Sequence, residues 1–285
     1  MTRRPHPRSR QTAGCQKRSI ALLLFLLAPL GSASTSAAAP PHELAAPKAI
    51  LKAAFTNRYE VNLISTIELT LHGRRGQQRN RTIRAVTKVI DGRVSSIGRL
   101  VAPEYLRGMT VLTMEDGKNV QNAFVFMPSL ERTRRITTSQ RGDAFFGSDV
   151  TYEDIERQRT EAFDIQSIVQ AEDSEEPTYV IEVRPRRRRN YARAVFTISR
   201  SDSAILKTRY YKRDTTKPYR VISADREQMV TLGGHTLPTH LRVQNLMRGT
   251  HTDVRLRDLR LADHVPDQLF SLRTLDQGRP IPGER

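Results

Sequence analysis

The sequence predicts a mainly β fold with a few helices (α+β), built from about eleven antiparallel strands. Hydrophobic and polar residues alternate from Leu63 onward, as they do along half-buried strands. Asp91-Gly92 and Asp116-Gly117 are hairpin-turn signals between such runs. Short turns separate most of the runs, which is typical of a barrel or a sandwich.

The first expected element is an amphipathic helix over residues Ala45 to Tyr59, with Ile50, Leu51, Ala54 and Phe55 on one side. The strands follow it with few interruptions. They are expected over Leu63 to Leu71, Ile83 to Val89, Val94 to Val101, Met109 to Glu115, Val120 to Met127, Tyr179 to Arg184, Tyr191 to Arg200, Ala204 to Lys212, Tyr219 to Leu232, His235 to Met247 and Thr250 to Ala262.

Two short helices complete the expected elements. Thr151 and Asp154 form a pair like a capping box at the start of a helix over Tyr152 to Gln158. A second helix is expected to start at Pro266 and to carry Leu269 and Phe270. No internal repeat or long linker divides the chain, so a single domain is expected.

The segment from Met127 to Ile155 is the most unusual part of the chain. It places two adjacent phenylalanines, Phe145 and Phe146, between Gly142 and Gly147, where the backbone is free to adopt conformations that other residues avoid. Two large apolar rings on such a loop require a cover. Either a concave surface of the protein or an apolar ligand would supply it.

Residues 1–39 have the order of a secretory signal peptide: a basic start, an apolar run from Ile20 to Leu30, and small residues from Gly31 to Ala39. The apolar run is roughly ten residues long, which is too short to span a bilayer of about 30 Å as a helix. Cleavage is expected between residues 33 and 39. The alternative is a short membrane anchor that stays uncleaved.

Removal of the leader would leave 41 basic and 30 acidic residues, a net charge of +11. A basic exported protein is attracted to anionic surfaces such as lipid headgroups. The export signal and the absence of a nucleic-acid motif argue against nucleic acid as a partner. Cys15, the one cysteine, lies in the leader, so residues 40–285 have neither a disulfide nor thiolate chemistry.

Several local patterns together carry a resemblance to a known family. They are Tyr105-Leu106-Arg107-Gly108, Phe126-Met127-Pro128-Ser129-Leu130 leading to Arg132, Arg134, Arg135 and Ile136, Phe146-Gly147-Ser148-Asp149 running into Tyr152-Glu153-Asp154, Leu237-Pro238, and the end from Asp267 to Leu275. In this order, and over about residues 45–275, the chain resembles the LolA-like outer-membrane lipoprotein-sorting proteins of Gram-negative bacteria.

The resemblance implies a fold and a role. The fold is an open antiparallel half-barrel over residues 40–285, whose concave face is covered by helices and a loop. The role is that of a periplasmic carrier that holds lipid or lipoprotein acyl chains on their way to the outer membrane. An inner-membrane transporter and an anionic membrane surface are further candidate partners, and no cofactor is expected.

An acyl chain needs an apolar cavity, because each buried methylene contributes about 0.8 kcal/mol. We expect the loop from Gly142 to Gly147 to be the lid of such a cavity. The alternative is that both phenylalanines are ordinary core residues under a long loop. The candidate lipid-binding and lid residues are Phe145, Phe146, Gly147, Met127, Leu130, Phe124, Phe126 and Tyr152.

Charged and polar residues of the same segment are candidate polar contacts: Arg132, Arg134, Arg135, Ser148, Asp149, Glu153 and Asp154. Ion pairs between these arginines and acids would fix the resting position of the lid. Alternatively, the arginines bind a lipid phosphate or an acidic partner. The arginine-rich run Arg184 to Arg189 is expected to be a solvated hairpin tip, with contact to anionic lipid as the alternative.

No enzyme is predicted. The sequence contains no zinc-binding histidine pattern, nucleophile elbow, phosphate-binding glycine loop or dinucleotide motif. Neither a metal site nor a catalytic residue is therefore expected, although residues assembled only in space would escape this search. The alternative to a carrier is a periplasmic binding module, an accessory or sensor for a membrane transporter or stress regulator.

Overall fold

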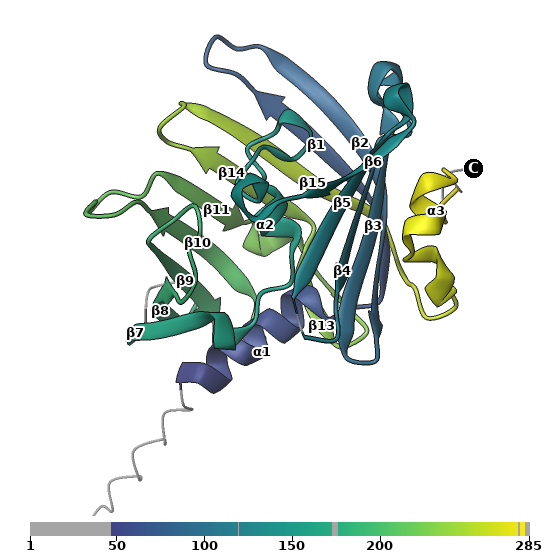
Figure 1. Ribbon diagram of the computed structural model, residues 1–285. Helices are drawn as coiled ribbons and strands as arrows, with labels where there is room; N and C mark the ends of the chain where they lie inside the picture. The colour runs from purple at the N-terminus through teal and green to yellow at the C-terminus, as the bar shows by residue number, and fades with distance from the viewer. Residues whose placement is uncertain (1–46, 119, 173–175, 279, 283–285) are drawn as a thin grey trace, which may run out of the picture. The chain divides into compact units, whose positions relative to one another are not determined.

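A thirteen-stranded antiparallel sheet forms the body of the computed structural model (Figure 1). The structure describes residues 47–118, 120–172, 176–278 and 280–282, which belong to one compact unit, Leu44–Arg285. The strand order is β6-β5-β4-β3-β2-β1-β15-β14-β11-β10-β9-β8-β7. The sheet curves but does not close, because β6 and β7 remain as its edges. The predicted leader, residues 1–39, lies outside the described residues.

Two further strands, β12 and β13, form a separate hairpin. The bounds of the fifteen strands are β1 (Leu63–His72), β2 (Gln78–Ile90), β3 (Arg93–Ala102), β4 (Thr110–Glu115), β5 (Gln121–Met127), β6 (Arg132–Ile136), β7 (Phe163–Ala171), β8 (Thr178–Pro185), β9 (Arg193–Ser199), β10 (Ile205–Tyr211), β11 (Arg220–Ala224), β12 (Met229–Leu232), β13 (His235–Pro238), β14 (His240–Asn245) and β15 (Thr250–Leu261).

The predicted class, an open antiparallel half-barrel, is confirmed, but the strand count of about eleven is too low. β6 and β7 were not predicted as strands. The long runs expected over Tyr219 to Leu232 and His235 to Met247 are each divided into two strands. At the first division, the Asp225 carboxylate accepts the backbone N–H of Glu227 at 3.2 Å and starts a short helical turn.

Helix α1 (Pro47–Tyr59) begins at a proline, as is common for the first helical residue. Its predicted apolar side is buried, and Phe55 packs edge-on against Phe196 of β9 at 5.4 Å between ring centroids. Near its end, the Asn57 side chain donates to the carbonyl of Thr236 and accepts its N–H, both at 2.8 Å. The helix therefore spans from β9 to the β12–β13 hairpin.

Both faces of the β1–β5 part of the sheet are covered. Successive residues of a strand point to opposite faces, and on β4 Val111 joins the cluster of the concave face while Leu112 joins the cluster of the convex face. The convex cluster includes Leu275 of α3 (Leu272–Asp276), which lies outside the curve of the sheet (Figure 1). Helix α2 (Tyr152–Ile155) lies inside it.

The predicted helix over Tyr152 to Gln158 ends earlier, at Ile155. The element expected after Pro266 is divided into a short turn, Asp267–Leu269, and α3. Among the described residues, none of the helices combines the length and the apolar character that a membrane crossing requires.

Candidate functional site: an apolar cavity on the concave face

A cavity of about 220 Å³ lies on the concave face of the sheet. Its wall is mostly aliphatic. Strands β1, β14 and β15 contribute Leu63, Ile67, Leu69, Leu241, Val243 and Val254. The end of α1 and residues 141–160, which we call the cover segment, complete the enclosure.

The alternation of the sequence builds this wall. On β1, every second residue from Leu63 to Leu69 lines the cavity, and on β2 Ala85 and Thr87 do the same. Several of the lining residues are small, namely Ser65, Ala85 and Ser96. Side chains of this size leave space in an interior that would otherwise be filled to normal packing density.

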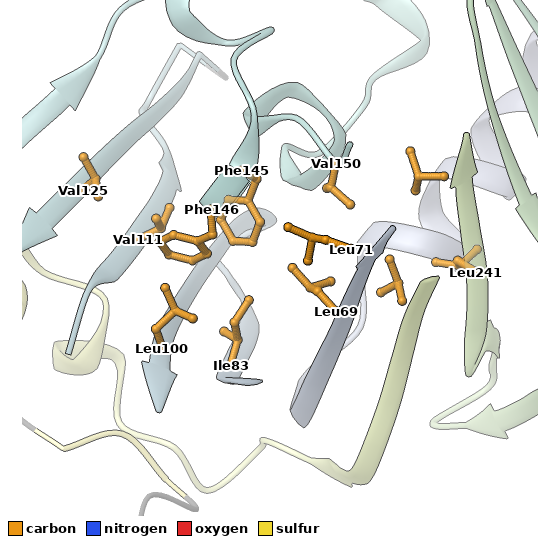
Figure 2. Packing of buried hydrophobic residues seen from close by; sticks show 12 residues of the cluster. Leu69, Leu71, Ile83, Leu100, Val111, Val125, Phe145, Phe146, Val150 and Leu241 are labelled. Carbon is orange, nitrogen blue, oxygen red and sulfur yellow. The ribbon is translucent and has the colours of Figure 1, made fainter. Parts of the chain in front are cut away.

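Phe145 and Phe146 point from the cover segment toward the sheet, as Figure 2 shows. Both are buried, their ring centroids are 4.3 Å apart, and Phe145 lines the cavity. Phe146 does not line the cavity and packs among core residues such as Leu100 and Val111. The backbone at Phe146 and Gly147 is left-handed, with φ of +50° and +76°. One ring is therefore part of the cavity wall and the other is part of the core.

The residues after the two phenylalanines fix them in place. The Ser148 hydroxyl donates to the Phe145 carbonyl at 2.6 Å, which closes the turn. The buried Asp149 carboxylate accepts the hydroxyls of Thr250 at 2.7 Å and Thr252 at 3.2 Å, and its N–H donates to Thr252 at 3.0 Å. These contacts join the cover segment to β15.

Three acidic residues in and next to α2 form ion pairs with arginines from three different places. Asp154 pairs with Arg220 of β11, and both side chains are buried. Glu153 pairs with Arg189 at 2.6 Å. Asp154 also accepts the N–H and the hydroxyl of Thr151, both at 2.8 Å, which confirms the predicted cap.

Glu156 is the third of these acids, and it lies 3.2 Å from Arg141. Its side chain is only 5% exposed. Burial, reinforced by the nearby Glu153, raises the pKa of Glu156 to about 7, although the Arg141 charge acts in the opposite direction.

A second cluster holds the far end of the cover segment. Glu115 of β4 accepts hydrogen bonds from Arg157 at 2.9 Å and from Arg159 at 2.8 Å. Arg157 also pairs with Glu60, just after α1. Burial alone would raise the pKa of Glu115, but hydrogen bonds from Arg159, the Val94 N–H and Arg157 outweigh it and hold that pKa below its usual value.

The structure brings together only part of the predicted site. Phe145 and Asp154 line the cavity, Tyr152 packs edge-on against Phe145 at 5.7 Å, and Met127 packs against the same core cluster. Leu130 is 63% exposed. Phe124 and Phe126 lie on the opposite face, in the cluster beneath α3, because their neighbour Val125 points to the concave side.

The predicted ion pairs within the segment are not the ones that form. Arg132, Arg134 and Arg135 are exposed on the edge strand β6, and Arg135 donates to Asn122. The acids Glu153 and Asp154 pair with Arg189 and Arg220, which are distant in sequence. The prediction assigned partners by proximity along the chain, whereas the fold supplies them from β11 and the β8–β9 loop.

Arg189 also departs from the expected solvated hairpin tip. Arg184, Arg186, Arg187 and Arg188 are exposed as predicted. Arg189 turns inward, and its guanidinium lies 5.1 Å from the ring centroid of Phe163. One arginine of the run is therefore structural.

Sequence reasoning did not find the polar end of the cavity. Arg58, Tyr59 and Asp154 line it there, and the same three residues line a smaller neighbouring cavity together with Tyr191 and Tyr210. Burial raises the pKa of Tyr59 and of Tyr210. Arg58 follows Leu51, Ala54 and Phe55 at helical spacing, so a charged residue on the apolar side of α1 was the available signal.

A group that could hold a metal ion lies on the outer side of the sheet. His72 of β1 and His251 of β15 are register partners, and their rings stack at 4.3 Å. With Asp253, their donor atoms lie within 4.8 Å of one another. Asp253 also accepts two hydrogen bonds from Arg242, which neutralise it in part. The pairing of β1 with β15 is long-range, so local motifs could not reveal the group.

Comparisons with known proteins agree with this fold. A family model described as "Uncharacterized protein" matches residues 92–277, more than half of the chain. No curated protein matches the sequence. A domain described as an outer membrane lipoprotein-sorting protein from Vibrio parahaemolyticus is 17% identical with a TM-score of 0.73, over 80% of this chain and 97% of that one.

Two further solved structures are similar. A DUF1329 family protein from Desulfovibrio piger is 20% identical with a TM-score of 0.72, over 80% of this chain and 98% of that one. A LolA superfamily protein from Nitrosomonas europaea is 20% identical with a TM-score of 0.63, over 79% and 97% of the two chains. At these identities the likeness establishes the fold.

Proposed function

We propose that this chain, which belongs to the family whose model matches residues 92–277 and has the fold of LolA-like proteins, is a periplasmic carrier of lipid or lipoprotein acyl chains. It binds hydrocarbon in the apolar cavity and delivers it toward the outer membrane. The supporting observation is the cavity itself, with aliphatic walls on the concave face and a cover segment above it. The expected signal peptide agrees with a periplasmic location, and the net positive charge agrees with work near anionic membranes.

The size of the cavity limits what it holds when the cover segment is in place. An engineered protein cavity of about 150 Å³ accommodates one benzene molecule. A cavity of about 220 Å³ therefore holds one short stretch of hydrocarbon rather than several acyl chains side by side. Eight buried methylenes would contribute roughly 6 kcal/mol to binding, before the cost of ordering the chain.

The chemistry of the site does not require a catalytic group. Hydrocarbon offers nothing for directional hydrogen bonds, so affinity comes from apolar area. The aliphatic wall from β1, β14 and β15 meets this requirement. We therefore assign the cavity a carrier role and not an enzymatic one.

Lipid extraction tests the proposal. The protein is purified from the periplasm without detergent, extracted with organic solvent, and the extract is analysed by mass spectrometry. An acyl species at a ratio approaching one per protein is the expected result. The variant Ala85→Phe fills the cavity and should lose the bound species. Ala53→Phe adds the same ring on the exposed side of α1 and should keep it.

The buried ion pairs that hold the cover segment favour a second candidate, a binding module whose cover does not open. Such a protein would act as an accessory or sensor for an inner-membrane transporter. It would be recovered without acyl species, and an Ala85→Phe variant would capture the transporter as well as the wild type does. Bound lipid that is lost only in Ala85→Phe would exclude this alternative.

A further inference from the structure

Three charged residues line the cavity, and only two of them have an oppositely charged partner. The three are Arg58, Asp154 and Arg157. Asp154 pairs with Arg220, and Arg157 pairs with Glu60 and Glu115. Among the described residues, Arg58 has no carboxylate within ion-pair distance, and its guanidinium lies 5.5 Å from the ring centroid of its neighbour Tyr59. Asp154 acts on Arg58 only at longer range.

The Tyr59 hydroxyl accepts a hydrogen bond from Arg58 but carries no charge, and a guanidinium in an apolar wall is costly to bury without a counter-charge. Arg58 and Arg220 share the single carboxylate of Asp154, so this end of the cavity has a surplus of positive charge. A guanidinium also binds carboxylates and phosphates in a bidentate manner, which makes it the side chain best suited to an anionic group.

Tyrosine hydroxyls surround the same end. A second cavity of about 20 Å³, room for about one water molecule, shares Arg58 and Tyr59 with the first and is also lined by Tyr191 and Tyr210. No hydrogen bond joins these three hydroxyls to a protein acceptor among the described residues. Burial raises the pKa of all three tyrosines, so each remains an O–H donor at neutral pH.

We propose that the cavity binds a single-chain amphiphile with an anionic head, a carboxylate or a phosphate ester, and that Arg58 and the tyrosines hold the head while the tail lies along β1 and β2. This inference rests on the proposed function and specifies its ligand. The apolar wall explains binding of a tail of any kind, whereas Arg58, which has no carboxylate partner, explains a preference for an anionic head.

Three ligands with one tail and different heads provide the test: dodecanol, dodecanoate and dodecyl phosphate. Their affinities for the full chain without its leader are measured by displacement of a fluorescent apolar probe, below the concentration at which micelles form. Both anions are expected to bind at least tenfold more tightly than dodecanol. The tighter of the two anions shows whether a fatty acid or a lipid phosphate is the closer match.

Variants of Arg58 test the assigned residue. Arg58→Gln should bring the affinity for the anions to the level of dodecanol and leave dodecanol unchanged, and Arg58→Lys should retain part of the preference. Arg107→Gln, which removes an exposed arginine paired with Glu104, should have no effect. Circular dichroism and thermal unfolding show whether each variant is folded.

The outcomes separate this inference from the proposed function. If the wild type binds dodecanol as tightly as the two anions, the inference is overturned and the carrier role stands. An anion preference that persists in a folded Arg58→Gln also overturns it, because another group then holds the head. If none of the three ligands binds, the proposed function fails together with the inference.

Discussion

Asp154 of α2 forms a buried ion pair with Arg220 of β11, a residue 66 positions further along the chain. Their side chains are 7% and 6% exposed. The Arg220 guanidinium also lies 4.7 Å from the ring centroid of Tyr210. The pair joins the cover segment to the part of the sheet that follows it in sequence. This pair, which we call the lock of the cover segment, is one of several contacts that hold the segment against the sheet.

Removal of one partner should therefore be costly. Asp154→Asn leaves the Arg220 charge buried without a counter-charge, and breaking a pair of this kind costs about 3–5 kcal/mol. We expect a loss of this size in the free energy of unfolding measured with urea. Asp91→Asn removes an acid that is 81% exposed and should change it by less than about 1 kcal/mol. Equal effects of the two substitutions would contradict the lock.

Glu156 should make stability depend on pH near neutrality. Its pKa is about 7 in the folded protein against 4.5 in the unfolded chain, so the folded state retains the proton more strongly. The contribution of Glu156 to stability is then fully present below pH 4.5 and is lost as the pH rises toward 7, by about 3 kcal/mol in total.

Glu156→Gln removes this dependence. The free energy of unfolding of the variant should exceed that of the wild type increasingly between pH 5 and pH 7, as followed by urea unfolding at several pH values. Glu104→Gln replaces an exposed acid and should follow the wild-type curve. A constant difference between Glu156→Gln and the wild type across this range would refute the assignment.

Truncation of a buried side chain should lower stability on either face of the sheet, but it should change ligand binding only on the concave face. Phe145→Ala enlarges the cavity and should cost about 3–5 kcal/mol, and Leu275→Ala removes a buried side chain of α3 at a cost of about 2–5 kcal/mol. Only Phe145→Ala should change the affinity for dodecanol, because Leu275 packs on the convex side. Altered dodecanol binding in Leu275→Ala would show that the two faces are coupled.

His251 should titrate below the usual histidine range. Burial, the neighbouring His72 and the Arg242 charge lower the pKa of His251, and Asp253 and Asp149 offset them only in part. An NMR titration should show this directly, and His72→Gln should move the His251 midpoint upward by removing one of the three causes. An unchanged midpoint in that variant would assign the shift to burial and Arg242.

The sequence predicted residues of the cavity wall, but it did not predict the ion pairs that hold the cover segment over the cavity. The alternation of Leu63, Ser65, Ile67 and Leu69 is enough to place these residues on one face of a strand, and the structure has them line the cavity. Alternation along a strand is a local property, so one sequence is sufficient to detect it. The apolar side of α1 was also predicted from a local pattern, in this case the helical spacing of its apolar residues.

The two strands that were not predicted, β6 and β7, lack a regular alternation of apolar and polar residues. β7 contains a register shift between Ile165 and Ser167, which interrupts the period of two. β6 is arginine-rich and mostly exposed, so it lacks the apolar face that marks a strand. The partners of Glu153 and Asp154 were mispredicted because pairing across the sheet depends on topology and not on sequence distance.

The exposed arginines of β6 matter for a protein whose sheet stays open. An unpaired edge presents free backbone groups to any other extended chain, including the edge of a second copy. Arg132, Arg134 and Arg135 give this edge a dense positive charge, so two copies repel each other where their borders would meet. Replacing them with valine or threonine would leave the cavity intact and make the protein prone to fibrous self-association.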